Sequence, residues 1–297
     1  MPYPLPPALS PSRVTAFTDC ALAFRFAVLD RLPEPPSPAA TKGTLVHAAL
    51  ERLYDLPPAA RTVGAAVAAL GQAHVALRDD PDLTGLGLDE EAEAAFVADA
   101  ERLVRRVFEL EDPTRVRAVG LELKLQADVG GVALRGIIDR LDLTDDGELL
   151  VTDYKSGRAP SERFEKSKLE GVNVYALLVE RVFGVRPVAV QLLYLGDPLA
   201  IICTPTEQSG RFVEQKIGAV WQTIMRANAG DSFKPKPGKL CDWCSYKTFC
   251  PAFGGDPDEA RRVGEELRVE RHAARGADAD TGTLPDLAEP LPYPAAG

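Results

Sequence analysis

The segment between Gly136 and Gly157 constrains the fold of this chain more than any other. It reads G-I-I-D-R-L-D-L-T-D-D-G-E-L-L-V-T-D-Y-K-S-G. Its apolar and β-branched residues predict two short strands, Ile137–Leu143 and Leu149–Lys155, and the Asp-Asp-Gly sequence at 145–147 predicts the turn between them. We therefore expect an antiparallel hairpin around which the rest of the chain is organised.

This hairpin would bring charged side chains together. If Asp146 is the centre of a three-residue loop, residues equidistant from it face each other, and Asp139 lies opposite Asp153. Asp153 and Lys155 share one face of their strand, whereas Tyr154 points to the other. Two opposed carboxylates destabilise a sheet unless a cation lies between them.

Carboxylate oxygens suit Mg²⁺ or Mn²⁺, and a lysine alongside suits developing charge on a phosphate. The pattern therefore indicates a site for metal-assisted phosphodiester chemistry. Taken alone, the same residues also fit an ordinary hairpin with surface charges at its rim.

The charge of the chain is unevenly distributed. A net charge of −10 over 297 residues argues against a uniformly basic nucleic-acid binder. Positive charge nevertheless gathers in two segments, Tyr154–Lys168 and Lys234–Lys247, and each has a net charge of +3. DNA contact is therefore expected beside the hairpin and near the C-terminal cysteines.

The N-terminal sequence M-P-Y-P-L-P-P has neither a basic region nor an apolar run, so we expect no signal peptide. No segment approaches the roughly 20 apolar residues that a membrane span requires. We expect a cytoplasmic protein without a membrane partner.

Hydrophobic periodicity predicts three strands, a helix, two further strands and a long helix, all preceded by helices. This order is typical of a mixed α/β sheet with helices on its faces. Predicted helices are Ser12–Phe26, a helix capped by Thr41 or Thr44 that runs to Tyr54, Val63–Leu77, Asp89–Leu110, Leu169–Phe183, one capped by Thr206 that runs to Ala229, and Pro257–Arg275. The rest of the C-terminal tail is expected to be disordered.

The chain divides into five expected parts. They are an N-terminal arm and helix (1–40), a helical region (41–115), an α/β core (116–232), a cysteine segment (233–253) and a charged helix with its tail (254–297).

Four of the five cysteines suggest a metal centre. Cys241, Cys244 and Cys250 are spaced C-x2-C-x5-C and need a fourth ligand, for which Cys20 is the candidate. Four thiolates bind zinc or an iron–sulfur cluster, and their spacing does not separate the two. Cys203 lies in an apolar strand and is expected in the core.

These features together resemble the RecB-like exonucleases of the PD-(D/E)XK superfamily. The resemblance is stronger to those with an iron–sulfur cluster, such as CRISPR-associated RecB-type nucleases and AddB-type nuclease domains. It runs in order through S-P-S-R-V-T-A-F-T-D-C-A with Cys20, G-T-L-V-H with His47, G-I-I-D-R-L-D with Asp139, D-Y-K-S-G with Asp153 and Lys155, and the closing C-x2-C-x5-C-P.

The chain departs from this family pattern at two positions. Ala21 replaces the usual proline after the first cysteine. The family often has Q-x-x-x-Y-A on the helix after the lysine strand; here Tyr175 matches, but Gly171 replaces the glutamine. The second change puts one DNA- or water-positioning contact in doubt and leaves the metal ligands intact.

The resemblance implies a restriction-endonuclease-like fold and a role for each matching residue. Asp139, Asp153, His47 and the Tyr154 carbonyl would hold Mg²⁺ or Mn²⁺. Lys155 would orient the attacking water and stabilise charge on the scissile phosphate. Glu51 would influence His47 or the metal through its charge, without binding the metal itself. Cys20, Cys241, Cys244 and Cys250 would hold a structural [4Fe-4S] cluster.

Three functional hypotheses follow. The first is a metal-dependent DNA exonuclease that acts on single strands or duplex ends in repair or recombination. The chain lacks the nucleotide-binding sequence G-x-x-x-x-G-K-[ST] of helicases, so any unwinding would come from a partner, a helicase or an adaptation protein. The second is a DNA-end-binding or partner-docking subunit with weak or silent nuclease activity. The third is a redox or zinc protein in which the Asp-x-Lys sequence is incidental.

Overall fold

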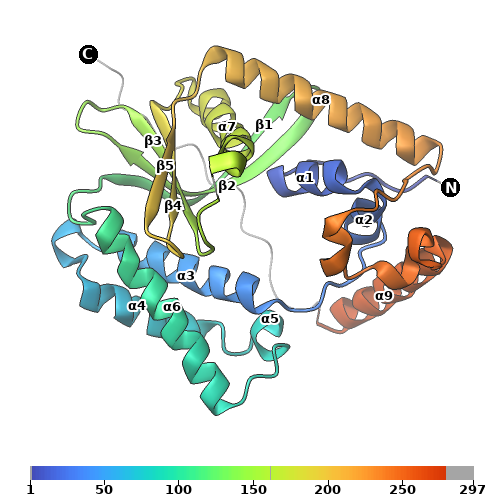
Figure 1. Ribbon diagram of the computed structural model, residues 1–297, viewed down its shortest axis with the longest axis horizontal. Coiled ribbons are helices and arrows are strands. Elements are labelled where there is room, and N and C mark those ends of the chain that lie inside the picture. Colours follow the sequence, from blue (N-terminus) through green and yellow to red (C-terminus); the bar gives the residue numbers. More distant parts are fainter. Residues whose placement is uncertain (1, 161, 279–297) are drawn as a thin grey trace.

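A mixed five-stranded sheet forms the centre of the molecule (Figure 1). The computed structural model describes residues 2–160 and 162–278. The strands lie in sequence order, and every neighbouring pair is antiparallel except the parallel pair β3 and β4. Their bounds are β1 Ala118–Val129, β2 Val132–Leu143, β3 Leu149–Lys155, β4 Ala189–Tyr194 and β5 Leu199–Cys203.

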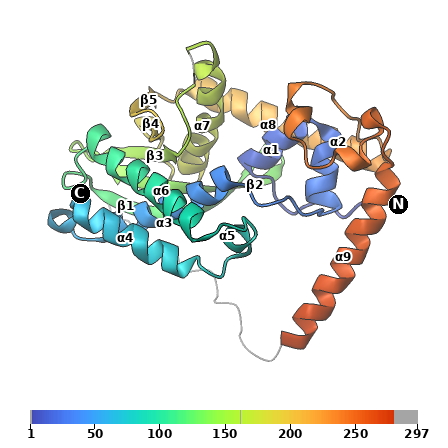
Figure 2. The ribbon, with the colours of Figure 1, turned by 60° about the horizontal axis from the view of Figure 1, so that its bottom comes forward.

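Helices cover both faces of the sheet, as Figures 1 and 2 show. Helices α7 (Glu162–Phe183) and α8 (Glu207–Ala229) pack on one face and bury a large apolar core there. Helices α3 (Pro38–Asp55), α4 (Val63–Ala76) and α6 (Glu90–Leu110) form a second core on the opposite face, where the short α5 (Pro81–Thr84) contacts α3. The predicted fold class and the predicted order of strands and helices are both confirmed.

The register of the central hairpin is also confirmed. Arg140 pairs with Thr152 and Leu143 with Leu149, so the residues equidistant from Asp146 do face each other. Gly147 adopts φ +80°, a conformation that glycine accepts without strain, and closes the turn. In agreement with the three strands predicted before the first core helix, β2 continues without a break from Val132 to Leu143, so the preceding hairpin and this one share a strand.

The predicted helix Ser12–Phe26 is interrupted at Cys20. Helix α1 (Pro11–Asp19) ends there, Cys20 is extended with φ −157°, and α2 (Ala21–Phe24) then leads into a π-helical turn, Arg25–Leu29. The reason is tertiary, because the backbone N–H of Leu22 donates to the Lys234 carbonyl at 3.3 Å instead of continuing the helix. This break brings Cys20 to the cysteine segment.

The start of α3 also differs from the prediction. The helix begins at Pro38 with Ser37 as its N-cap, not at Thr41 or Thr44. Proline suits the first helical position because it lacks the N–H that would be unpaired there. Thr41 instead lies within the helix, where its hydroxyl donates to the Asp82 carbonyl.

The cysteine segment (233–253) contains three short 3₁₀ helices, Lys239–Trp243, Lys247–Phe249 and Pro251–Phe253, and is followed by α9 (Pro257–Asp278). Figure 2 shows α9 projecting from the end of the molecule that carries α1 and α2. The helix extends three residues beyond the predicted end, and the remainder of the predicted disordered tail lies outside the described residues. Within the described residues, no helix combines the length and the apolar character needed to span a membrane.

Candidate active site

His47, Asp139 and Glu122 meet where α3 crosses the first two strands. His47 Nδ1 lies 3.4 Å from Asp139 Oδ1. The other carboxylate oxygen of Asp139 accepts a hydrogen bond of 2.7 Å from the backbone N–H of Tyr154. One ligand atom from each of His47, Glu122 and Asp139 lies within 4.8 Å of the other two. This is a set of donors gathered around one point.

Glu122 was not among the predicted site residues, although the sequence holds a signal for it. Gly130 and Gly131 form a two-residue turn, and residues equidistant from it face each other across β1 and β2. That relation places Glu122 opposite Asp139, between the observed pairs Leu121–Arg140 and Leu123–Ile138. Glu122 also has φ +44°, an uncommon conformation for a residue other than glycine, and such strain is found most often at functional sites.

Asp153 and Lys155 lie on the same face of β3, as predicted. The Asp153 carboxylate is buried and forms an ion pair with the Lys155 ammonium group, which is itself partly exposed. This pair is formed by Asp153 Oδ2, which accepts no other hydrogen bond from the described residues. Burial raises the pKa of Asp153, the nearby Asp139 charge raises it further, and Lys155 opposes the change. Such a carboxylate is poised to accept a further cation.

Negative charge also affects the other groups of the site. Burial favours neutral His47, but its hydrogen bond to Asp139 and the charges of Asp139, Asp153 and Glu122 outweigh burial and raise the pKa of the imidazole. Burial raises the pKa of Glu122, and repulsion from Asp139 adds to it. The site thus carries more negative charge than its own residues neutralise.

The ligand atoms of this site match the preferences of a divalent cation. Two carboxylates and one imidazole converge, and the buried Asp153 carboxylate, paired with Lys155, lies beside them on β3. Oxygen-rich sites with one histidine suit Mn²⁺ and Mg²⁺. The residues present therefore fit such an ion, and Asp139, Glu122, His47 and Asp153 are the side chains that could hold it.

Two hollows meet at His47. One is lined by Gly43, Glu51, Glu122 and Lys124 among others, and the second by Tyr154, Lys155, Arg158 and Tyr194 among others. Glu51 therefore lies in the same hollow as His47, and its charge contributes to the raised pKa of Glu122. Lys124 and Arg158 add positive charge at the sides, where a phosphate would approach.

Helix α7 packs on β2 next to the site, with Leu178 and Tyr175 against Gly136. Gly136 permits this approach, because a Cβ atom there would lie 2.6 Å from Leu178 Cδ1. Tyr175 packs against the same glycine, and the charges of Asp153 and Asp139 add to the burial that raises its pKa. Gly171, which stands where the family often has glutamine, has open space around it, so no described side chain takes the place of the missing amide.

A buried arginine supports the site from the opposite face of the sheet. The Arg140 side chain is fully buried and donates to both oxygens of Glu111, at 2.7 and 2.8 Å. It also donates to Asp142 at 2.8 Å and to the Tyr154 hydroxyl. Arg140 therefore fixes the Tyr154 side chain, whose backbone N–H holds Asp139.

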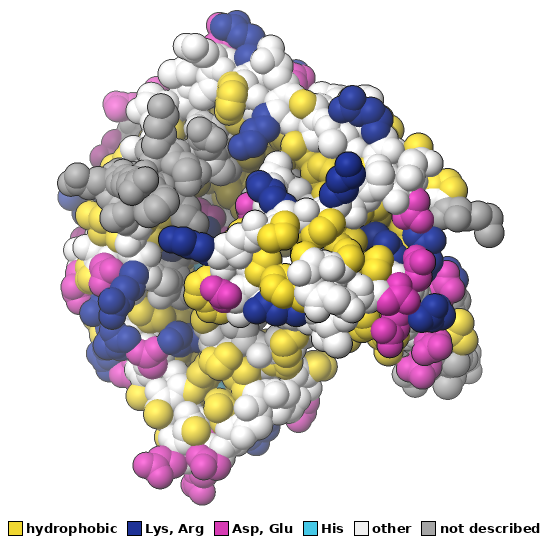
Figure 3. All heavy atoms as spheres, turned by 45° about the vertical axis from the view of Figure 1, so that its right-hand side comes forward, with side chains coloured by type: hydrophobic (Ala, Val, Ile, Leu, Met, Phe, Trp, Pro, Cys, Tyr) yellow, Lys and Arg dark blue, Asp and Glu magenta, His cyan; other side chains and the backbone are white. Residues whose placement is uncertain are grey.

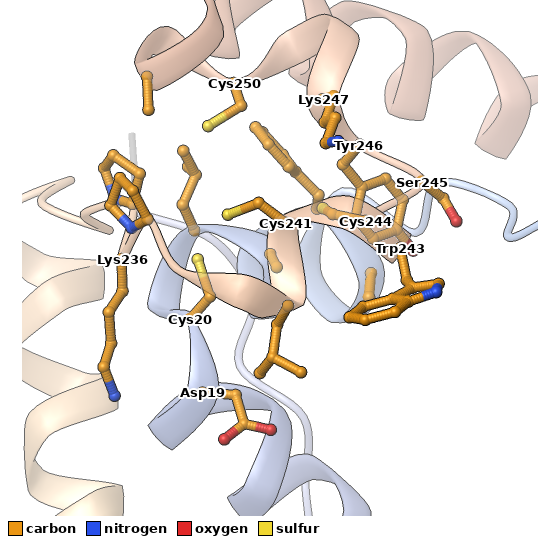
Figure 4. A pocket seen from close by; sticks show the side chains of 18 of the residues that line it. Asp19, Cys20, Lys236, Cys241, Trp243, Cys244, Ser245, Tyr246, Lys247 and Cys250 are labelled. Carbon is orange, nitrogen blue, oxygen red and sulfur yellow. The ribbon is translucent and has the colours of Figure 1, made fainter.

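The structure gathers the four predicted cysteine ligands. Cys20, Cys241, Cys244 and Cys250 line one cavity, and Figure 4 shows the sulfur atoms of Cys20, Cys241 and Cys250 directed toward a common space. Burial raises the pKa of Cys244, and the other three thiols raise it further. Cys203 lies elsewhere, on β5, where its thiol donates to Asn173.

Four thiolates around one cavity suit either a structural zinc ion or an iron–sulfur cluster.

Comparisons with known proteins agree with this geometry. A family model described as the PD-(D/E)XK nuclease superfamily matches residues 8–251. The gene 69 protein of Mycobacterium phage D29 is 24% identical over 275 residues, which cover 83% of this chain and 97% of that protein. The gene 69 protein of Mycobacterium phage L5 is 28% identical over 137 residues, or 45% of this chain and 44% of that protein.

Among solved structures, a "putative exonuclease" from Eubacterium rectale has a TM-score of 0.55 at 14% sequence identity. The match covers 81% of this chain and 88% of that one. At this identity the likeness concerns the fold.

Proposed function

Because this chain belongs to the PD-(D/E)XK nuclease superfamily, we propose that it is a metal-dependent DNA exonuclease of the RecB type, which hydrolyses phosphodiester bonds. One observation carries the proposal. His47 on α3 lies 3.4 Å from Asp139 on β2, and the ion pair of Asp153 and Lys155 lies beside them on β3, where the backbone N–H of Tyr154 donates to Asp139.

The metal is proposed to be Mg²⁺ or Mn²⁺, held by Asp139, Asp153, His47 and the Tyr154 carbonyl, with Glu122 as a further carboxylate. A bound divalent ion would polarise the phosphate and lower the pKa of a coordinated water. The remaining chemistry falls to this chain's own residues.

Lys155 is the proposed catalytic cation. Its ammonium group pairs with Asp153 yet remains partly exposed to the hollow, so it can donate to an incoming water or phosphate oxygen. The Asp153 carboxylate favours the charged form of Lys155. Burial lowers the pKa of Lys155, but the effect of Asp153 outweighs burial, so the pKa of Lys155 is raised overall. A lysine kept charged in this way stabilises the negative charge that develops on the phosphorane-like transition state.

His47 and Glu122 are proposed to shape the metal site. His47 reaches Asp139 from α3 and can bind metal only when its imidazole is neutral. Glu51, in the same hollow, is proposed to act on this pair through its charge.

We also propose that Cys20, Cys241, Cys244 and Cys250 hold a structural [4Fe-4S] cluster. Their common cavity supports a shared metal centre, and the resemblance of the C-x2-C-x5-C-P spacing to cluster-bearing nucleases favours the cluster over zinc. Protein purified without oxygen should show broad visible absorbance, with about four irons and four sulfides per chain. Stoichiometric zinc without iron would contradict the proposal, and Cys20→Ser, with Cys203→Ser as the matched control, would identify the fourth ligand.

DNA repair or recombination is the proposed setting, with single strands or duplex ends as substrate and a helicase or similar protein supplying any unwinding. The proposed location is the cytoplasm.

The nuclease proposal is tested with end-labelled linear DNA, single- and double-stranded, incubated with Mg²⁺ or Mn²⁺. We expect progressive shortening that EDTA abolishes and that Asp153→Asn and Lys155→Ala each abolish. Tight DNA binding without cleavage under either ion would instead indicate a DNA-end-binding or partner-docking subunit, for which the open space at Gly171 is the structural reason.

A further inference from the structure

The cysteine segment presents large apolar side chains to solvent. Trp243 is 78% exposed, Leu240 61% and Phe253 52%. All three line the same hollow as the thiols, and Figure 4 shows the Trp243 indole directed away from the sulfur atoms. A cluster ligand loop needs no exposed tryptophan, so the metal centre does not account for this side chain.

Positive charge lies among these side chains. The stretch from Lys234 to Lys247 contains four lysines and a single acid, Asp242. Lys247 Nζ lies 5.5 Å from the centre of the Phe253 ring, an arrangement that keeps the ring and the charge together. In the part of the chain that the structure describes, neither Lys234 nor Lys239 pairs with a carboxylate.

The acidic groups nearby are few. Asp19 and Glu34 line the same hollow, but Glu34 accepts a hydrogen bond from the Tyr246 hydroxyl. Figure 3 shows dark-blue lysine and arginine side chains among yellow hydrophobic ones on this side of the molecule. In a chain with a net charge of −10, a basic surface with exposed rings is the exception.

Other exposed rings lack these neighbours. Phe212 on α8 is 52% exposed, but the adjacent Arg211 is neutralised by an ion pair with Glu207. Exposed hydrophobic residues are common on protein surfaces. The cysteine segment is distinguished by exposed rings beside lysines such as Lys234 and Lys239, whose charge no carboxylate of the described residues neutralises, while Lys236 donates only to the Thr18 carbonyl.

We propose that Trp243, Phe253 and the lysines at 234, 236, 239 and 247 form a binding surface for single-stranded DNA, outside the active site. Bases stack on exposed aromatic rings in a sequence-tolerant way, and lysines follow the phosphates. A duplex does not fit this chemistry, because the faces of its bases are already covered by their neighbours. The inference rests on the proposed function and adds to it a preference for unpaired strands.

The test uses the small number of tryptophans. The chain has two, Trp221 and Trp243, and Trp221 lies on α8, partly buried against the core. In a Trp221→Phe, Asp153→Asn double variant, all indole emission comes from Trp243 and the DNA is not cleaved. Titration with an oligothymidine should quench this emission, whereas a duplex of equal length should leave it nearly unchanged.

Affinity measured by fluorescence anisotropy gives an independent reading. In the Asp153→Asn background we expect Trp243→Ala to weaken oligothymidine binding about tenfold, and Trp243→Phe to retain most of the affinity. Phe212→Ala is the matched control and should bind as its parent does. Lys239→Gln should lower the slope of log affinity against log salt by about 0.7, the value for one phosphate contact on a single strand.

The surface is disproved if saturating oligothymidine leaves Trp243 emission unchanged and Trp243→Ala binds as Phe212→Ala does. Should Trp243→Ala disturb the cysteine cluster, the emission of the double variant and the salt dependence of Lys239→Gln still decide the question. Failure of the wild-type protein to cleave DNA, with quenching intact, would overturn the nuclease proposal and leave the surface standing. Cleavage of DNA by the wild-type protein, with no quenching of Trp243 emission in the double variant, would overturn the binding surface and leave the nuclease proposal standing.

Discussion

The two faces of β3 differ in how well their polar groups are satisfied. Thr152 and Tyr154 face Arg140, Asp142 and Glu111 in a buried network whose donors and acceptors pair with one another. Asp153, between them in sequence but on the other face, has its buried Oδ2 paired with Lys155 alone, and the nearby Asp139 charge repels it. The same strand therefore carries one satisfied face and one less satisfied face, which we call the unsatisfied face because its carboxylates repel one another.

This difference shows how a sheet can support a site of concentrated negative charge. Repulsion among Asp139, Glu122 and Asp153 would tend to separate the three strands that carry them. Arg140 connects β2, β3 and the end of α6 from behind, and its guanidinium lies 4.1 Å from the centre of the Tyr54 ring on α3. The satisfied network thus resists the strain that the unsatisfied face produces.

The largest expected effect comes from breaking the satisfied face. Arg140→Ala would leave Asp142 and Glu111 as buried carboxylates without their partner, and we expect a loss of about 4 kcal/mol in the free energy of unfolding. Urea denaturation measures it. Arg135→Ala, on the exposed side of the same strand, is the control and should change stability by less than about 0.5 kcal/mol. Equal losses in the two variants would mean that the network does not hold the sheet together.

A smaller effect should follow from completing the unsatisfied face. With Mn²⁺ at about 100 times its dissociation constant, the folded protein should gain about 2.7 kcal/mol. The gain should be seen as a rise in urea midpoint that EDTA reverses. Asp139→Asn should lose most of it, and a gain of the same size in that variant would place the ion elsewhere.

Removing one charge from the unsatisfied face should stabilise the metal-free protein. The raised pKa of Asp153 means that the folded state binds this proton more tightly than the unfolded state, so stability falls as pH rises from the ordinary aspartate value through the raised one. In EDTA near neutral pH we expect Asp153→Asn to gain about 1 kcal/mol while abolishing cleavage. The gain should disappear at acidic pH. A variant less stable than wild type at neutral pH would show that the Lys155 ion pair outweighs the burial of Asp153.

The last prediction concerns metal affinity instead of folding stability, through proton competition at His47. Because metal requires the neutral imidazole, Mn²⁺ affinity should fall with decreasing pH, by about tenfold per unit below the raised pKa of His47. Titration calorimetry at several pH values measures this dependence. His47→Gln should bind Mn²⁺ more weakly and with a shallower pH dependence, and an unchanged slope would assign the proton to another group.

The features that the sequence predicts correctly are those determined by local interactions. The hairpin register follows from one turn, so spacing from Asp146 is enough to place Asp139 near Asp153, one residue beyond the last observed pair, Arg140 and Thr152. The alternation of a strand likewise separates Tyr154 from Asp153 and Lys155. Glu122 could have been placed in the same way, because the Gly130–Gly131 turn determines its position, but a single acid in L-E-L-K-L looks like an exposed strand residue.

Other features depend on distant parts of the chain, and local sequence does not predict them. The break at Cys20 is caused by a contact with Lys234, so the helical periodicity from Ser12 to Phe26 predicted one helix where two occur. The role of Arg140 depends on Glu111 at the end of α6 and on Tyr54 on α3. Burial of an arginine can be recognised only once its partners are in place.

The meeting of the two ends of the chain matters while the protein is being made. Tyr3 and Asn228 exchange two backbone–side-chain hydrogen bonds across 225 residues, and Phe26 packs against Tyr246 and Phe249. At about 10 residues per second, the ribosome delivers these covering residues roughly 20 seconds after Phe26. During that interval the nascent chain exposes an aromatic segment that chaperones can bind, and a chain terminated before residue 240 exposes it permanently and becomes a substrate for proteolysis.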